Sequence, residues 1–593
     1  PRQPTVRRHT YSVSLALALC EGEIAGVSRL WADGAELAMA DLSLRVYRGT
    51  QDQMPDPLIE AIEGAGAVPA YRGTAYVVIE DLSLEAFGNR VPQFSFEVTR
   101  PDLEDASDVP LAVRGVAMIP GTGEYAYATR PVTLGRGLDG QLKGRGGVVN
   151  VNSAGQQPDV LASLAQLRDE VPNCGAASLI VSWFGNDLRC GNCTIRPAVE
   201  QSVSDSPDMP WTVCGVDRAS AVEVPRLGDR PVYGGTPCDA SVIEAIRAMQ
   251  ADGLSVMVYP FILMDQLAGN GRTDPWTGHA DQPELPWRGR ITTSLGPGQP
   301  GTPDQTATAD AEVAAFFGTA SASDFAVSGD GVIYSGPSEW RYRRFILHQA
   351  ALCAAAGGVE SFCIGSEMRA LTQIRGANGF PAVQALRDLA AECRAILGPG
   401  VRIGYAADWS EYFGYQPTDG SGDRYFHLDP LWADDEIDFI GIDNYMPLSD
   451  WRDTPGHADE GYDTIYDLAY LRDGIEGGEG YDWYYASDAD RLIQQRSPIT
   501  DGAHNEPWIW RYKDVRNWWD NPHHERIGGV RQVTPTAWVP RSKPVRFTEL
   551  GCAAIDKGTN QPNKFLDPKS SESDLPHFST GLRDDLIQRQ YLR

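Results

Sequence analysis

The chain has 593 residues, which is too long for one hydrophobic core and predicts two to four domains. An excess of 80 acidic over 51 basic residues gives a formal net charge of −29. Such a surface repels phosphate backbones and so excludes sequence-specific nucleic-acid binding as the expected function. No apolar run reaches the roughly 20 residues that cross a bilayer, and no signal-peptide pattern opens the chain.

The first 145 residues predict a β-rich domain. Short segments rich in β-branched and aromatic residues, bounded by Gly, Asp and Pro, lie at 10–19, 43–49, 74–82 and 92–99. A further β-like patch covers 112–134. A Gly- and Asn-rich stretch without apolar periodicity then predicts a linker at 146–157.

From residue 158 to 593 the pattern changes to helices alternating with continuous apolar runs. The predicted helices are 158–170, 239–250, 340–357 and 381–398, and the apolar runs are 177–185, 253–262, 358–367, 401–409, 437–445 and 544–551. This alternation predicts a parallel sheet covered on both faces. Over more than about 400 residues it favours a (β/α)8 barrel above a doubly wound sheet. The long stretch 446–540, rich in Trp and Tyr, predicts a large insertion on the rim of the barrel.

The strand count falls short of a closed barrel. About seven strands are recognisable, and 583–593 predicts a helix after which an eighth strand is due. The expectation is that the polypeptide continues past Arg593.

Two glutamates stand where barrel enzymes carry catalytic groups. Glu367 and Glu549 each follow or end an apolar run, which places both at the carboxyl ends of strands. Hydrolysis of a glycoside needs two carboxyl groups, one that protonates the leaving oxygen and one that attacks or activates water. A glutamate after a strand also serves as a negative charge at a helix N-terminus, and for either residue alone that interpretation is favoured. The pair together favours catalysis.

Other strand ends carry residues suited to sugar contacts. The candidates are Trp183, Asp408, Trp409, Asp443, Asn444 and Tyr445, and rim packing is the alternative for each aromatic residue. No phosphate-binding loop, nucleophile elbow or metalloprotease motif appears. No metal and no cofactor is expected. The close pair Cys190 and Cys193 lacks two further zinc ligands within reach. Two free thiols are the expected state, and a local redox-active pair is the alternative.

Particular segments carry a resemblance to known proteins. Residues 18–37 and 71–98 resemble the opening of tail-tip hub proteins of siphophage-like particles, closest to the large host-specificity hub, or "megatron", protein of gene transfer agents. The barrel resembles that family's glycoside-hydrolase-like TIM domain, most specifically over 511–565. The resemblance spans nearly the whole chain. It implies a homotrimer in a baseplate hub at the tail tip of a virion-like particle, contacts to other tail proteins, and assembly in the bacterial cytoplasm.

The barrel also resembles retaining glycosidases of the large TIM-barrel clan. In that clan strand four ends in Asn-Glu, the acid/base, and strand seven ends in the nucleophilic Glu. Glu367 and Glu549 match those positions, but Ser366 stands where the clan has the Asn that binds the sugar.

Two functions therefore stay open. In the first, the barrel of a tail hub hydrolyses envelope glycan, either peptidoglycan or a surface polysaccharide. In the second, the same barrel is inactive and binds glycan or supports the structure. A free secreted glycosidase explains the N-terminal segment less well.

Overall fold

The computed structural model describes residues 10–64, 66–100, 109–121, 123–135, 147–153 and 155–593. Two positions of the predicted linker, 146 and 154, lie outside these described residues, as do 1–9, 101–108, 122 and 136–145. Among the described residues no helix has the length and hydropathy of a membrane span.

The N-terminal domain is made of two small antiparallel sheets. One has the strand order β1-β5-β4 and the other β3-β2-β6. The elements are β1 (Ser12–Glu21), β2 (Gly26–Ala32), β3 (Ala35–Leu37), β4 (Ser43–Tyr47), α1 (Pro57–Glu63), β5 (Thr74–Ser83) and β6 (Phe94–Thr99). Val77 and Ile79 of β5 are fully buried at the centre of their core. The four β-segments predicted before residue 100 are thus confirmed.

Seven parallel strands form the main sheet of the described chain, in the order β26-β21-β20-β19-β16-β8-β7. They are β7 (Gly115–Met118), β8 (Ala176–Gly185), β16 (Ser255–Met264), β19 (Ser361–Ser366), β20 (Arg402–Asp408), β21 (Phe439–Asn444) and β26 (Val545–Leu550). Each apolar run that predicted a strand forms one, which confirms the nearly closed barrel of TIM type. The barrel sheet begins earlier than predicted, however, because β7 pairs in parallel with β8 and lies inside the range assigned to the N-terminal domain.

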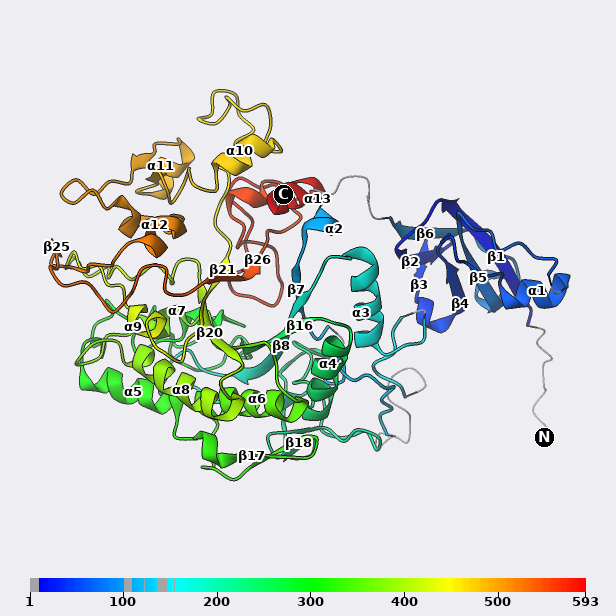
Figure 1. Cartoon of the computed structure of the whole chain (residues 1–593), viewed down its shortest axis with the longest axis horizontal. Coiled ribbons are helices and arrows are strands. Elements are labelled where there is room, and N and C mark those ends of the chain that lie inside the picture. Colours follow the sequence, from blue (N-terminus) through cyan, green and yellow to red (C-terminus); the bar gives the residue numbers. More distant parts are fainter. Residues whose placement is uncertain (1–9, 65, 101–108, 122, 136–146, 154) are drawn as a thin grey trace.

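Helices cover the outside of this sheet (Figure 1). They are α3 (Asp159–Glu170), α4 (Asp239–Ala251), α5 (Ala307–Phe317), α6 (Tyr342–Ala356) and α8 (Pro381–Leu397). The connections hold the short helices α2 (Val109–Ala112), α7 (Arg369–Thr372) and α9 (Asp429–Trp432). Helix α6 is buried along almost its whole length between the strands and α8. The predicted helices are therefore confirmed, including the last one, α13 (Asp585–Leu592).

The barrel is open at one seam. Strands β7 and β26 stand at the two ends of the strand order, and no described strand joins them. A cavity of about 1370 Å³ runs along this seam, lined by Gly115–Ala117 on one side and Arg546–Leu550 on the other. Phe547 and Leu550 are about half exposed there.

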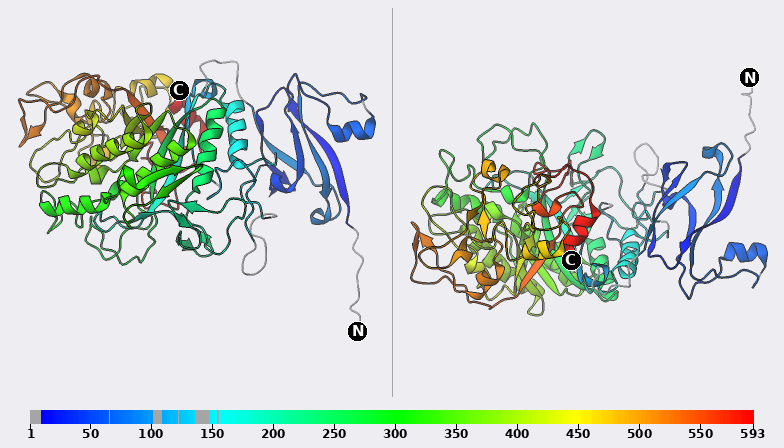
Figure 2. Two further views of the ribbon diagram at one scale, coloured as in Figure 1. Left: turned by 60° about the horizontal axis from the view of Figure 1, so that its bottom comes forward. Right: turned by 90° about the horizontal axis from the view of Figure 1, so that it is seen from above.

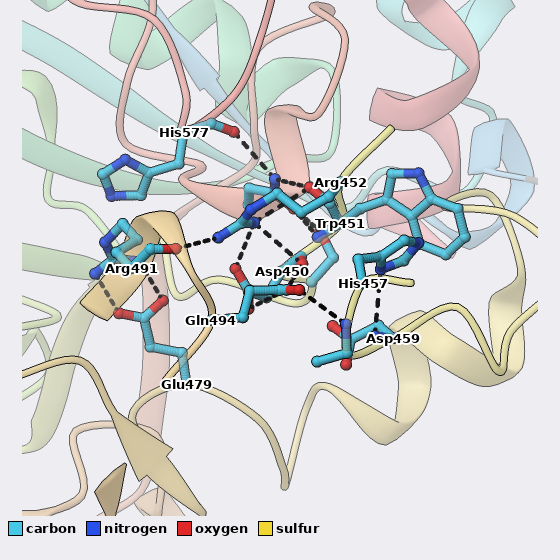
Figure 3. A network of polar contacts seen from close by, with 12 residues as sticks. Asp450, Trp451, Arg452, His457, Asp459, Glu479, Arg491, Gln494 and His577 are labelled. Atoms are coloured by element: carbon cyan, nitrogen blue, oxygen red, sulfur yellow. Dashed lines mark hydrogen bonds and ion pairs between the residues drawn. The ribbon is translucent and has the colours of Figure 1, made fainter. Parts of the chain in front are cut away.

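The predicted rim insertion follows β21 and consists of short elements. These are α10 (Leu468–Asp473), β22 (Trp483–Tyr484), α11 (Asp488–Leu492), β23 (Ser497–Pro498), α12 (Val515–Asp520), β24 (Arg526–Ile527) and β25 (Val530–Arg531). Polar contacts hold it together (Figure 3): Asp450 accepts from Arg452 at 2.6 Å and from Arg496 at 2.9 Å. The Arg452 guanidinium also donates to the Arg491 carbonyl oxygen at 3.1 Å.

The N-terminal domain stands at one end of the molecule, next to α3, in all views (Figures 1 and 2). Arg48 forms an ion pair with Asp169 of α3, and the Gln156 amide donates to the Ala40 carbonyl oxygen at 3.2 Å. Short hairpins lie between the barrel strands, and the best formed is β17 (Phe325–Ser328) with β18 (Gly331–Tyr334).

Candidate active site

Three carboxylates meet at the carboxyl ends of β19, β21 and β26, with β20 between the first two of these strands. Glu367 follows β19 directly, Asp443 lies near the end of β21, and Glu549 lies near the end of β26. One carboxylate oxygen of each residue lies within 4.8 Å of those of the other two. Retaining glycosidases hold their two carboxyl groups about 5–5.5 Å apart, whereas inverting enzymes leave about 6.5–9.5 Å for a water molecule. The nearest oxygens of Glu367 and Glu549 are close enough for both carboxyl groups to act on one glycosidic bond.

Glu367 is held by two neighbours from a loop after β16. The indole nitrogen of Trp287 donates to its Oε2 at 2.9 Å, and the Arg288 guanidinium lies 2.9 Å from the same oxygen. The backbone of Glu367 has φ +48°, a left-handed conformation that is costly for a side chain with a Cβ. This strained turn and the two donors together fix the direction of the carboxyl group.

The pKa of Glu367 is raised to about 8. Burial is the largest cause; the Arg288 guanidinium opposes it, and the charges of Glu549 and Asp408 add to it. One cation cannot balance several carboxylates in a site from which water is largely excluded, so a proton is retained. The expectation that Glu367 has the raised pKa is thus confirmed in direction.

Glu549 has a different environment. The Tyr445 hydroxyl donates to its Oε2 at 2.6 Å, which stabilises a carboxylate anion. Burial raises the pKa of Tyr445 far above its usual range, and the neighbouring Glu549 raises it further, so the hydroxyl keeps its proton. The predicted site residue Tyr445 therefore lies in the site and binds a glutamate.

Asp443 lies close to both glutamates and is fully buried. Its oxygens accept hydrogen bonds from Tyr259 at 2.6 Å and Thr548 at 2.7 Å. Burial raises the pKa of Asp443 well above its usual range, and the charges of Glu549 and Glu367 act in the same direction. This burial corrects the expectation of a sugar contact, because the Asp443 oxygens are bound by Tyr259 and Thr548.

Ser366 is also buried, and its hydroxyl is engaged. It lies 2.8 Å from the Tyr259 hydroxyl, whose one proton is donated to Asp443, and it accepts a hydrogen bond from the Arg288 guanidinium. The Arg288 Nε also donates to the Ser366 carbonyl oxygen at 3.0 Å. The Arg288 guanidinium lies over the ring of Phe261, 3.5 Å from its centroid. A serine thus leaves room for a buried arginine that binds both Ser366 and Glu367.

One predicted residue, Trp183, faces away from this site. The Trp183 side chain is fully buried between β8 and the surrounding helices, where its ring stacks on Phe345 of α6 with 5.0 Å between ring centroids. Its neighbours Ile180 and Ser182 line the seam cavity, and alternation along a strand turns Trp183 to the helix layer. The expected role of Trp183 is therefore wrong. Asn444 accepts from the Met446 amide at 3.1 Å and shapes the turn after β21.

Asp408 and Trp409 line a second cavity together with Trp287. The Asp408 carboxylate accepts from the Ser410 amide at 2.9 Å and is almost completely buried. Burial raises the pKa of Asp408, against the hydrogen bonds from Ser410 and the charges of Arg369 and Arg288. Trp409 packs edge-on against Tyr512 of the rim insertion, with 4.8 Å between ring centroids.

Sequence reasoning missed Trp287 and Arg288. Both lie in a loop between β16 and α5, where no periodic pattern exists to read. The only local signal is an aromatic and a basic residue between Pro286 and Gly289, which many surface loops share.

The carboxylate cluster also has the ligand types of a cation site. Its donor set argues against one, because Asp443 already accepts from Tyr259 and Thr548. The Arg288 guanidinium supplies the positive charge next to Glu367, and would repel a metal ion. Cys190 and Cys193 are buried free thiols, and burial raises the pKa of Cys193 to about 11.

Comparison with known proteins finds similarity in the C-terminal part of the chain. Residues 340–593 match the model of the GTA TIM-barrel-like domain. No curated protein matches the chain. One solved structure, "Virion of native gene transfer agent (GTA) particle", is 62% identical over 19% of this chain and 27% of that chain, with a TM-score of 0.18. The chain thus covers about a quarter of the length of that particle protein.

Two further similarities are to glycoside hydrolases. A GH113 β-1,4-mannanase complex is 13% identical and covers 73% of this chain and 75% of that chain, with a TM-score of 0.31. The GH113 β-mannanase AaManA from Alicyclobacillus acidocaldarius is also 13% identical, with 73% and 74% covered and a TM-score of 0.31. TM-scores this low support no argument about activity. The match over 340–593 shows that this part of the chain is similar to the TIM-barrel-like domain of gene transfer agents.

Proposed function

We propose that this protein is the tail hub of a gene transfer agent particle and that its barrel hydrolyses a glycan of the bacterial envelope by a retaining mechanism. The observation that carries the hydrolysis is the pair Glu367 and Glu549, with carboxylate oxygens within 4.8 Å and a pKa of about 8 for Glu367. Such a pair offers one protonated acid and one nucleophile on either side of a glycosidic bond.

Each residue has one part in the proposed reaction. Glu549 attacks the anomeric carbon while Glu367 protonates the departing oxygen, so that the glycosidic bond breaks and a glycosyl ester forms on Glu549. Glu367, now ionised, then takes a proton from water, which hydrolyses the ester and frees Glu549. Trp287 and Arg288 are positioning residues for Glu367, and Tyr445 is one for Glu549.

The decisive experiment is turnover of purified envelope glycans by the 593-residue chain. Peptidoglycan and surface polysaccharide are offered separately, and reducing ends are measured with and without EDTA. We propose that one of them is cleaved and that chelation leaves the rate unchanged, because Arg288 holds the positive charge of the site. Cleavage of neither glycan, with binding of one, would establish the alternative: a hub whose barrel only binds glycan.

Replacement of Ser366 by Asn tests the departure from the clan pattern. The larger side chain has no free space, because the Ser366 hydroxyl contacts Tyr259 and Arg288 in a buried position. We expect Ser366→Asn to displace Arg288, to cost about 1–3 kcal/mol of stability by overpacking, and to lower turnover. Ser366→Ala, which adds no volume, is the control and should keep more activity. A rise in turnover for Ser366→Asn would show that Arg288 is dispensable.

The hub role predicts three copies of the chain in the particle. Its support is the family match together with the resemblance of 18–37 and 71–98 to tail-tip hubs. A particle reconstruction should place a ring of three N-terminal domains at the tail tip, in contact with other tail proteins. A single copy or a six-fold ring contradicts the proposal, and leaves the proposed hydrolysis untouched.

A further inference from the structure

A second cavity, of about 380 Å³, lies beside the carboxylate cluster, between the barrel and the rim insertion. Trp287 and Asp408 form its wall on the side of Glu367. Because Trp287 also donates to Glu367, one indole separates this cavity from the proposed acid. A chain molecule cleaved at Glu367 would therefore extend into it.

Two aromatic side chains also line this cavity. Trp409 and Tyr512 meet edge to face there, at 4.8 Å between ring centroids. The Tyr512 ring packs directly against Gly480, which has φ +79°. A Cβ at position 480 would lie 2.0 Å from the Tyr512 Cζ, so any other residue there would displace the ring. Aromatic walls of this kind provide an apolar surface for the faces of sugar rings.

The cavity also holds an arginine that is not engaged. The Arg369 side chain is exposed at the start of α7, and its guanidinium has no ion pair or hydrogen bond with any described residue. Arg491, on the same cavity, differs: Glu479 binds it through two contacts, of 2.8 and 2.6 Å (Figure 3). The Asp408 carboxylate accepts from the amide and hydroxyl of Ser410 and forms no ion pair with Arg369. A cation in the wall is thus available to a ligand.

We infer that this second cavity is a subsite for a sugar residue that bears a carboxylate, and that Arg369 binds this carboxylate. A guanidinium presents paired N–H donors that match the two oxygens of a carboxylate. Gln561 and Asn563, whose side-chain amides have no partner among the described residues, supply groups for sugar hydroxyls. This inference rests on the proposed function and narrows its substrate class to acidic glycans.

Two sources of envelope glycan share this chemistry. One is a uronic acid of a surface polysaccharide, and the other is the lactyl carboxylate of peptidoglycan strands freed of their peptides. The test therefore uses two probes, a tetragalacturonate and a peptide-free peptidoglycan tetrasaccharide. The methyl ester of each probe, which lacks the negative charge, is the uncharged control. Binding is measured by calorimetry on the full chain carrying Glu549→Gln, which prevents cleavage.

We expect at least one acid probe to bind about tenfold or more tightly than its ester, since a hydrogen bond to a charged group contributes about 1.5–3 kcal/mol. Arg369→Gln should abolish this difference, and Arg369→Lys should keep part of it. The affinity for the acid should fall as salt rises, while that for the ester should not. Arg516→Gln, at an exposed arginine of the rim insertion that pairs with Glu476, is the matched control and should change nothing.

Equal affinity for acid and ester, or an acid preference that survives Arg369→Gln, would overturn the subsite. The two proposals fail separately. Binding that depends on Arg369 without any cleavage by the unmodified chain contradicts the hydrolase and keeps the subsite. Cleavage that is indifferent both to esterification and to Arg369→Gln contradicts the subsite and keeps the hydrolase.

Discussion

Replacement of Glu549 by Gln is expected to lower glycan turnover by about four orders of magnitude or more. Loss of a nucleophile closes the covalent route, and single losses from catalytic groups that act together have effects of about this size. The change is nearly isosteric, and the amide still accepts a hydrogen bond from Tyr445, whose hydroxyl lies 2.6 Å from Oε2 in the native chain. Folding should therefore be retained, as thermal unfolding will show.

A matched substitution separates chemistry from charge. Glu476→Gln removes the same charge on the exposed rim insertion, where Glu476 pairs with Arg516, and should leave turnover unchanged. If Glu549→Gln retains a tenth or more of the native rate while its unfolding temperature is unchanged, Glu549 is not the nucleophile. The retaining assignment then fails.

The second large effect concerns the proton on Glu367. With a pKa of about 8, this group is protonated at neutral pH and loses its proton as the pH rises through that value. Because the acid must donate that proton, kcat on a natural glycan should fall above pH 8. Glu367→Gln should cut turnover by about 10² to 10⁴-fold and abolish this alkaline fall.

Substrates with good leaving groups provide the control. An aryl glycoside whose phenol leaves without protonation needs no acid, so glycosylation of the Glu367→Gln variant by it should be nearly normal. Rates for both substrate types across pH 5–10 decide the role. An equal loss on both, or an alkaline fall that persists in the variant, would assign the acid to another residue.

Much of this architecture follows from the sequence because the hydrophobic pattern of each strand and helix lies within a few consecutive residues. Continuous apolar runs alternating with amphipathic helices predict a parallel barrel, and strand order in a barrel follows chain order. Glu367 and Glu549 were therefore predicted at one end of the barrel from their places after apolar runs. The catalytic role of the pair stays a prediction until turnover is measured.

Tertiary structure alone decided which side of each strand faces the site. Both faces of a barrel strand are buried, so hydrophobicity does not tell the face toward the barrel interior from the face toward the helices. The sequence therefore predicts a sugar contact for Trp183, whereas its side chain packs in the helix layer. Strand β7 has four residues, too few for a pattern, and only its pairing with β8 reveals it. Trp287 and Arg288 reach Glu367 from about 80 positions away in the chain. No local rule of sequence encodes such a contact, because folding of the loop against the barrel creates it.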